Sequence, residues 1–127
     1  RFARMVAAQG GPSDVLERAG LPEAAVVRDL PAPEAGVVEA IDGRALGWAV
    51  VHLGAGRMVE TDRVDPSVGV TAILAPGTEV AKGDPLLRIH AASAEAADRA
   101  AAELLPAFRI GATPPAPAPL VIERVGP

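Results

Sequence analysis

The 127-residue chain contains no cysteine and no tyrosine, and it has very few other aromatic residues. Without cysteine it can hold neither a disulfide framework nor a thiolate-ligated metal ion. Phe2, Trp48 and Phe108 are too few to build a stacking platform for single-stranded nucleic acid. Lysine occurs once, at Lys82, and the net charge is −4. Because such a chain offers no basic surface for a phosphate backbone, we expect no nucleic-acid partner.

Long apolar runs are also missing, although 50% of the residues are hydrophobic. No run approaches the ~18 apolar residues that a membrane span requires, so we expect no membrane partner. The first residues do not resemble a signal peptide. The chain starts at Arg1 rather than Met, and its first turn lacks a capping side chain. We therefore expect it to be part of a longer protein.

The apolar residues that are present are mostly small and aliphatic. The chain has 27 Ala, 15 Val, 11 Leu and 5 Ile, which predicts a finely packed aliphatic core. Its length suits one domain that needs no disulfide or metal to fold.

Capping residues and glycines mark four expected helices, which span residues 1–9, 14–19, 44–53 and 93–105. Ser13 and Ser93 are suitable N-caps, as is Asp42 before the third helix. Since the 44–53 segment is apolar almost all round, we expect it to be a buried helix. Trp48 would then lie in the core, and Gly47 would mark close packing against another element.

Clusters of β-branched and other apolar residues predict the extended segments, which are residues 26–30, 36–41, 70–74, 79–80, 86–89, 108–110 and 120–125. Pro31 and Pro33 suggest a domain boundary. The charged segment 57–69 is expected to be a surface loop. Residues 113–119 have the composition of a polyproline-type spacer.

Three groups of residues could carry chemistry, and for each the structural interpretation is favoured. His52 and His90 have no second ligand at metal-binding spacing. Gly54–Arg57 could cradle an anion, but it lacks the remaining residues of a phosphate loop and follows a helix, so a helix-ending turn with Arg57 as a structural hydrogen-bond donor is preferred. The carboxylates of Glu60, Asp62 and Asp65 lack the pattern of a calcium loop and indicate a solvated acidic loop.

No nucleophilic motif is present, so the residues alone indicate a non-catalytic module. We expect no catalytic, cofactor-binding or metal-binding residue and no cofactor. An autonomous phosphate-binding role for Gly54–Arg57 remains an alternative.

The segment Pro76–Leu86 resembles a chain-reversing hairpin of biotinyl and lipoyl carrier domains. Gly77, Val80, Gly83 and Leu86 match its pattern of turn glycines and inward apolar residues. The alternative to an enzyme domain is therefore a biotinyl/lipoyl-like binding or carrier module. Carriers present a modifiable lysine on an exposed hairpin, whereas Lys82 belongs to the structural turn.

A broader resemblance covers essentially the whole chain. The segments that carry it, in order, are Ala8-Gln9-Gly10-Gly11, Gly36–Asp42, Arg44–Arg57, Asp65–Val70, Lys82–Leu86 and Ile89-His90-Ala91. Together they resemble the C-terminal region of the thymidine phosphorylase and pyrimidine-nucleoside phosphorylase family. The occurrence of all of them in this order is specific, whereas each tetrapeptide alone is weak.

The resemblance implies an accessory domain of an enzyme that converts a pyrimidine nucleoside and phosphate into the free base and a (deoxy)ribose 1-phosphate. It implies a cytoplasmic homodimer whose catalytic groups lie in upstream α and α/β domains. The implied fold is α+β, an α/β-hammerhead related to the barrel-sandwich hybrid, after a short N-terminal helical segment. Residues 1–30 would end the preceding α/β domain, 34–112 would form the hammerhead, and 113–127 would be a Pro-rich spacer and final strand.

Overall fold

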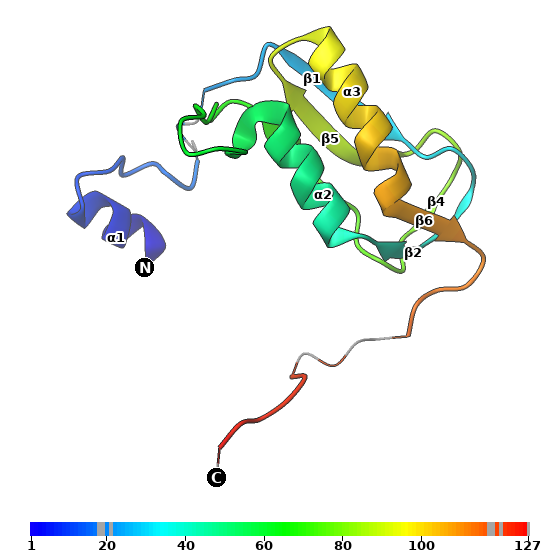
Figure 1. Cartoon of the computed structure of the whole chain (residues 1–127). Helices are drawn as coiled ribbons and strands as arrows, with labels where there is room; N and C mark the ends of the chain where they lie inside the picture. Colours follow the sequence, from blue (N-terminus) through cyan, green and yellow to red (C-terminus); the bar gives the residue numbers. More distant parts are fainter. Residues whose placement is uncertain (18–19, 21, 117–118, 120, 127) are drawn as a thin grey trace.

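The computed structural model describes residues 1–17, 20, 22–116, 119 and 121–126. This part of the chain contains two three-stranded antiparallel sheets, ordered β1-β5-β3 and β4-β2-β6, together with three α-helices (Figure 1). The strands are β1 Val26–Pro31, β2 Gly36–Ile41, β3 Gly69–Thr71, β4 Glu79–Val80, β5 Pro85–Ala91 and β6 Phe108–Gly111. The helices are α1 Phe2–Ala8, α2 Gly43–Val50 and α3 Ala94–Leu104. The α+β class is therefore confirmed.

Two predicted caps set where the main helices begin. The Asp42 carboxylate accepts hydrogen bonds from the backbone N–H groups of Arg44 and Ala45, at 2.9 and 3.0 Å. The Ser93 hydroxyl accepts one from Ala96 N–H at 3.1 Å. These bonds satisfy N–H groups that have no partner inside the helix. No helix in the described part of the chain is long and apolar enough to cross a membrane.

The core lies between the helices and the sheets. Helix α3 packs on the β1-β5-β3 sheet and buries Ala97, Ala100 and Leu104. Helix α2 lies beside α3 (Figure 1). The largest fully buried side chains are all aliphatic, as predicted: Leu86, Leu87, Ile89, Leu104 and Val38. Phe108 joins them at 8% exposure.

The expectation that the 44–53 helix is buried is wrong. Regular α-helix ends at Val50, and a π-helical turn over Val51–Ala55 follows it. Ala49 is the only buried residue of α2, and Trp48 is 47% exposed. A Cβ atom added to Gly47 would meet nothing within 4 Å, so no described element packs closely there. The physical reason is that α2 packs on one side only.

The expected helix over 14–19 is a turn in its described part. Residues 13–17 form turns, and Glu17 N–H donates to the Asp14 carbonyl at 2.8 Å. Residues 18 and 19 lie outside the described residues. A segment this short between chain-breaking glycines cannot repay the cost of starting a helix.

Three predictions about strands also need correction. Strand β3 ends at Thr71 rather than residue 74, because Ala72 has a φ of +52°. Strands β4 and β5 belong to different sheets, so Pro76–Leu86 is not a paired hairpin. Of the last predicted strand, Leu120 lies outside the described residues and 121–126 has no regular structure. This tail has no paired neighbour, and Ile122 is 94% exposed.

Strand β1 is an integral part of the folded unit. It extends one residue beyond the predicted 26–30 segment and pairs with β5 from Val26↔Ala91 to Pro31↔Pro85, with an irregularity after Leu30. Residues 26–31 therefore share a sheet with the centre of the module. Assignment of residues 1–30 to the end of a preceding domain stays a prediction, with the qualification that its last five residues pair with β5.

Candidate functional site

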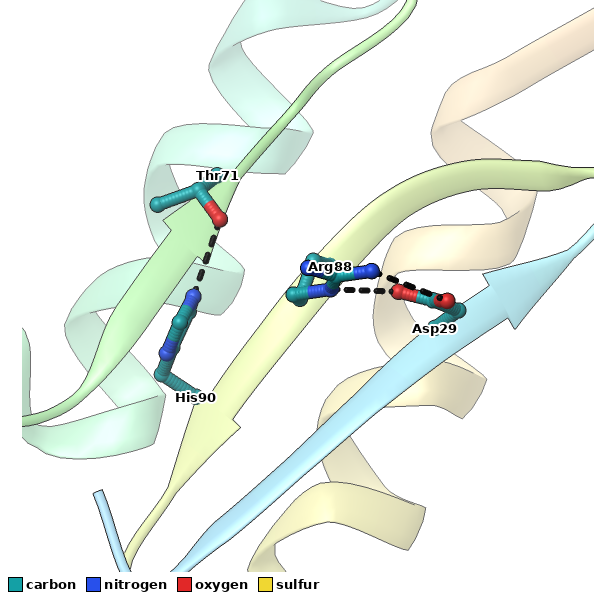
Figure 2. A network of polar contacts seen from close by, with 4 residues as sticks. All are labelled: Asp29, Thr71, Arg88 and His90. Atoms are coloured by element: carbon teal, nitrogen blue, oxygen red, sulfur yellow. Dashed lines mark hydrogen bonds and ion pairs between the residues drawn. The ribbon is translucent and has the colours of Figure 1, made fainter. Parts of the chain in front are cut away.

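The face of the β1-β5-β3 sheet opposite the helices carries a row of paired polar side chains (Figure 2). Arg88 on β5 lies opposite Asp29 on β1. Its Nε donates to Asp29 Oδ1 at 2.7 Å and its Nη2 donates to Asp29 Oδ2 at 3.3 Å. This forked contact is the geometry that suits a guanidinium and a carboxylate. Because the hydrogen bonds favour both charged forms, the pKa of Asp29 is lowered and that of Arg88 is raised.

His90, two residues after Arg88 on β5, lies on the same face of the sheet and contacts strand β3. Its Nε2 lies 2.9 Å from Thr71 Oγ1, a hydrogen bond whose donor depends on the histidine tautomer (Figure 2). His90 also pairs in register with Val27 on β1 and with Gly69 on β3. His90 is therefore already hydrogen bonded on the outward face of the sheet. This supports the structural role that the sequence favoured over catalysis or metal binding.

A hollow of about 510 Å³ opens beside His90. Its floor includes the sheet residues Val27, Thr71 and His90. Its walls come from the incoming chain at Pro22–Ala24 and from the end of the loop at Pro66–Val68. Gly69 contributes no side chain to this row, which leaves the space open on the β3 side.

His52 lies elsewhere, in the π-helical turn after α2. Its Nδ1 is 2.8 Å from Glu103 Oε2 on α3, and its ring centroid is 6.1 Å from that of Trp48. The contact links the end of α2 to α3. Within the described ranges, no three His, Asp or Glu side chains gather in a way that could hold a metal ion.

Gly54–Arg57 ends the helical segment, as predicted. Gly54 has a φ of +108°, a conformation that glycine adopts without strain, and its carbonyl accepts from Asp65 N–H at 2.9 Å. The chain then extends at Gly56. Arg57 is exposed, and across the residues that the structure describes it makes no side-chain hydrogen bond, so its donor role stays a prediction.

The acidic loop is more organised than predicted. Asp62 Oδ2 accepts from Met58 N–H at 2.9 Å and from Val59 N–H at 3.0 Å. Asp65 Oδ1 accepts from the backbone N–H and the hydroxyl of Ser67, at 2.9 and 2.6 Å. These bonds lower the pKa of Asp65. Both half-buried aspartates therefore shape turns, whereas Glu60 is exposed.

Lys82 occupies a turn held by hydrogen bonds of its neighbours, one between backbone groups and one to the Asp84 carboxylate. Gly83 has a φ of +94°, and its N–H donates to the Ala32 carbonyl at 2.9 Å. Asp84 Oδ2 accepts from Ala81 N–H at 2.8 Å. Val80 and Leu86 on either side are both in the core, as predicted. The turn leads the chain from one sheet to the other.

The sequence interpretation did not single out Asp29 and Arg88. Each is a charged residue in an extended segment and precedes a buried apolar residue: Asp29 precedes Leu30, and Arg88 precedes Ile89. That alternation could have placed both on an outward face. Their pairing required the register of β1 on β5, which joins residues 59 positions apart.

Comparison with known proteins identifies the fold's relatives. Residues 37–111, more than half of the chain, match the family model described as "Pyrimidine nucleoside phosphorylase C-terminal domain". A thymidine phosphorylase of Burkholderia cenocepacia (strain HI2424) is 45% identical over 127 residues, covering 98% of this chain and 29% of the relative. A thymidine phosphorylase of Mesorhizobium japonicum is 44% identical over 131 residues, covering 99% of this chain and 29% of the relative.

The chain thus spans less than a third of the length of these curated relatives. Apart from Gly36, the segments that resemble the phosphorylase family from strand β2 to strand β6 lie within the range that the family model matches. The likeness to the relatives extends over nearly all remaining residues. The chain belongs to the pyrimidine nucleoside phosphorylase family, as its C-terminal domain.

Proposed function

We propose that the chain is the accessory domain of a thymidine-cleaving nucleoside phosphorylase. The observation that carries this proposal is 44–45% identity to thymidine phosphorylases over 98–99% of the chain. In the proposed reaction, the bond between the base and the sugar C1′ breaks and a bond from C1′ to a phosphate oxygen forms. The products are the pyrimidine base and a (deoxy)ribose 1-phosphate. Positive charge on the sugar must be stabilised as that bond breaks.

The domain itself is proposed to supply no catalytic, cofactor-binding or metal-binding residue. The polar side chains that could act are already engaged with neighbours: His52 with Glu103, His90 with Thr71 and Asp29 with Arg88. These partners support structural roles. The groups that bind phosphate and nucleoside are proposed to lie in upstream α and α/β domains of the same polypeptide.

Finer features of the proposal concern fold and assembly. The domain is proposed to be an α/β-hammerhead related to the barrel-sandwich hybrid, which the packing of two small antiparallel sheets with α2 and α3 supports. The parent enzyme is proposed to be a cytoplasmic homodimer. Residues 1–30 are proposed to end the preceding α/β domain, with β1 pairing onto the accessory sheet, 34–112 to form the hammerhead, and 113–127 to form a Pro-rich extension.

An activity assay on the complete polypeptide tests the enzymatic proposal. Thymidine and inorganic phosphate should give thymine and deoxyribose 1-phosphate in equal amounts, and omission of phosphate should stop thymine release. A purine nucleoside serves as the control substrate and should remain uncleaved. Release of thymine without phosphate, or no release at all, would contradict the proposal.

A deletion tests the accessory role. Removing residues 34–127 from the complete polypeptide should lower its thermal stability while leaving the upstream active-site groups present. Unchanged stability would contradict a supporting role. The carrier alternative makes a separate prediction, because a biotinylated or lipoylated Lys82 would add mass to the intact chain. If the intact chain has its unmodified mass, the carrier alternative is excluded. The Lys82→Arg control should differ from it only by the mass of the substitution.

A further inference from the structure

The sheet face opposite α3 has the properties of a surface that another part of the protein covers. Val27, the second residue of β1, has 53% of its surface exposed. Beside it, the hollow of about 510 Å³ is lined mostly by apolar residues, with Glu23 and Ser67 in its walls and the hydrogen-bonded His90–Thr71 pair in its floor. A concave, mostly apolar hollow with a few oriented polar groups suits a packed side chain better than it suits bulk water.

The hollow is built from segments far apart in the sequence. Strands β1, β3 and β5 form its floor, and Pro22–Ala24 and Pro66–Val68 form its walls. Val68 is 8% exposed and therefore anchors its wall in the packed domain. Strand pairing holds the floor, so the hollow is a feature of the sheet rather than of one loop.

The course of the chain indicates which part of the protein lies nearest. Pro22–Ala24 line the hollow and lead directly into β1, so the polypeptide that precedes β1 arrives at this face. The relatives carry more than two thirds of their length outside the matched region, and the family model is that of a C-terminal domain. This additional part is upstream. A short covalent connection raises its effective concentration at the surface where the connection enters.

We propose that this open face of the β1-β5-β3 sheet is the docking surface for the upstream part of the same polypeptide. An apolar side chain from that part fills the hollow over Val27, and the His90–Thr71 pair lies at its edge. The Asp29–Arg88 ion pair continues the contact along the sheet. This proposal rests on the proposed function, because it requires the longer phosphorylase chain.

Cysteine accessibility in the complete polypeptide tests the surface. The 127 residues contain no cysteine, so Val27→Cys introduces a single thiol here, and peptide mapping separates it from any upstream thiol. Val121→Cys is the matched control, since Val121 is 59% exposed and Val27 is 53% exposed. Maleimide labelling of each native protein is normalised to its rate in urea. We expect Val27→Cys to react at least tenfold more slowly than Val121→Cys, and equal rates would overturn the proposal.

A cross-link identifies the occupant. Glu23 is exposed at the hollow, and Glu23→Cys can carry a benzophenone maleimide. A cross-linked product of monomer mass, joined to a peptide upstream of Arg1, supports the proposal. A product of dimer mass would assign the surface to a second copy and overturn it. If Val27→Cys changes the circular dichroism spectrum, the cross-link alone decides.

Activity separates this proposal from the proposed function. A protected Val27→Cys thiol in a protein that does not cleave thymidine with phosphate retains the docking surface and overturns the enzymatic proposal. A freely labelled Val27→Cys thiol in an active phosphorylase supports the enzymatic proposal and overturns the docking surface.

Discussion

The two faces of the β1-β5-β3 sheet are made by the same strands and have opposite chemistry. On the α3 side, Leu30, Leu87 and Ile89 are at most 3% exposed. On the other side, Val27, Asp29 and Arg88 remain substantially exposed. Because successive strand residues point to opposite faces, one register decides both surfaces at once. The comparison separates the contacts that hold the domain together from those available to the rest of the polypeptide.

The largest expected effect comes from the buried face. Leu87→Ala should lower the free energy of unfolding by about 2–5 kcal/mol, because it removes buried methyl groups and leaves a cavity. Val27→Ala on the same sheet should change it by no more than about 0.5 kcal/mol in the 127-residue chain. Urea unfolding followed by circular dichroism measures both. Similar losses for the two variants would show that the faces are not energetically distinct.

A smaller effect is expected where a helix is covered on one side only. Trp48 on α2 is 47% exposed, so Trp48→Ala should cost about 1 kcal/mol, roughly half of the transfer free energy of a buried large side chain. A fully buried tryptophan would cost about 3–5 kcal/mol. Trp48→Phe is the conservative control. Urea unfolding of the 127-residue chain checks the value, and a loss above about 3 kcal/mol would mean that α2 is covered on both sides.

The smallest effect belongs to the ion pair on the open face, and it depends on pH. The folded state lowers the pKa of Asp29 below its usual 3.8, mainly through the Arg88 hydrogen bond. Its stabilisation is therefore present above that value and is lost as pH falls through the lower folded-state pKa. Asp29→Asn should make the decline in melting temperature below about pH 4 shallower, with little change at pH 7 because the pair is exposed.

The double variant Asp29→Asn/Arg88→Leu provides the check on this ion pair. It should follow the same acid profile as Asp29→Asn, because either change removes the contact. Thermal melts between pH 3 and 7 measure the profiles. If Asp29→Asn declines as steeply as the unmodified chain at low pH, the ion pair does not contribute to acid sensitivity.

The starts of α2 and α3 and the turns at Gly54 and Gly83 could be predicted because their signals are local, although the helix expected after Ser13 forms only turns. Asp42 and Ser93 each cap a helix through a bond to an N–H two or three residues away. Gly54 and Gly83 adopt the positive φ values that favour glycine. The resemblance to the phosphorylase family was likewise carried by short segments in order. In each case the determining residues are neighbours in the chain.

Several predictions failed because they depended on distant partners. An apolar pattern cannot distinguish a helix packed on all sides from one packed on a single side, so Trp48 was wrongly placed in the core. The segment around Val80 and Leu86 correctly indicated two inward side chains, but not that they belong to strands of different sheets. The final strand was predicted from β-branched residues, which stabilise a strand only where a neighbour pairs with it.

The candidate surface shows the same division between features set by neighbouring residues and features set by distant ones. The sequence by itself determined an aliphatic core without cysteine, the capped helices and the family to which the chain belongs. Only the tertiary structure decided that Asp29 meets Arg88, that His90 meets Thr71 and that a hollow opens next to Val27. The physical reason is range: caps and turns are settled by a few adjacent residues, whereas sheet register selects partners tens of residues apart and thereby decides which side chains are buried.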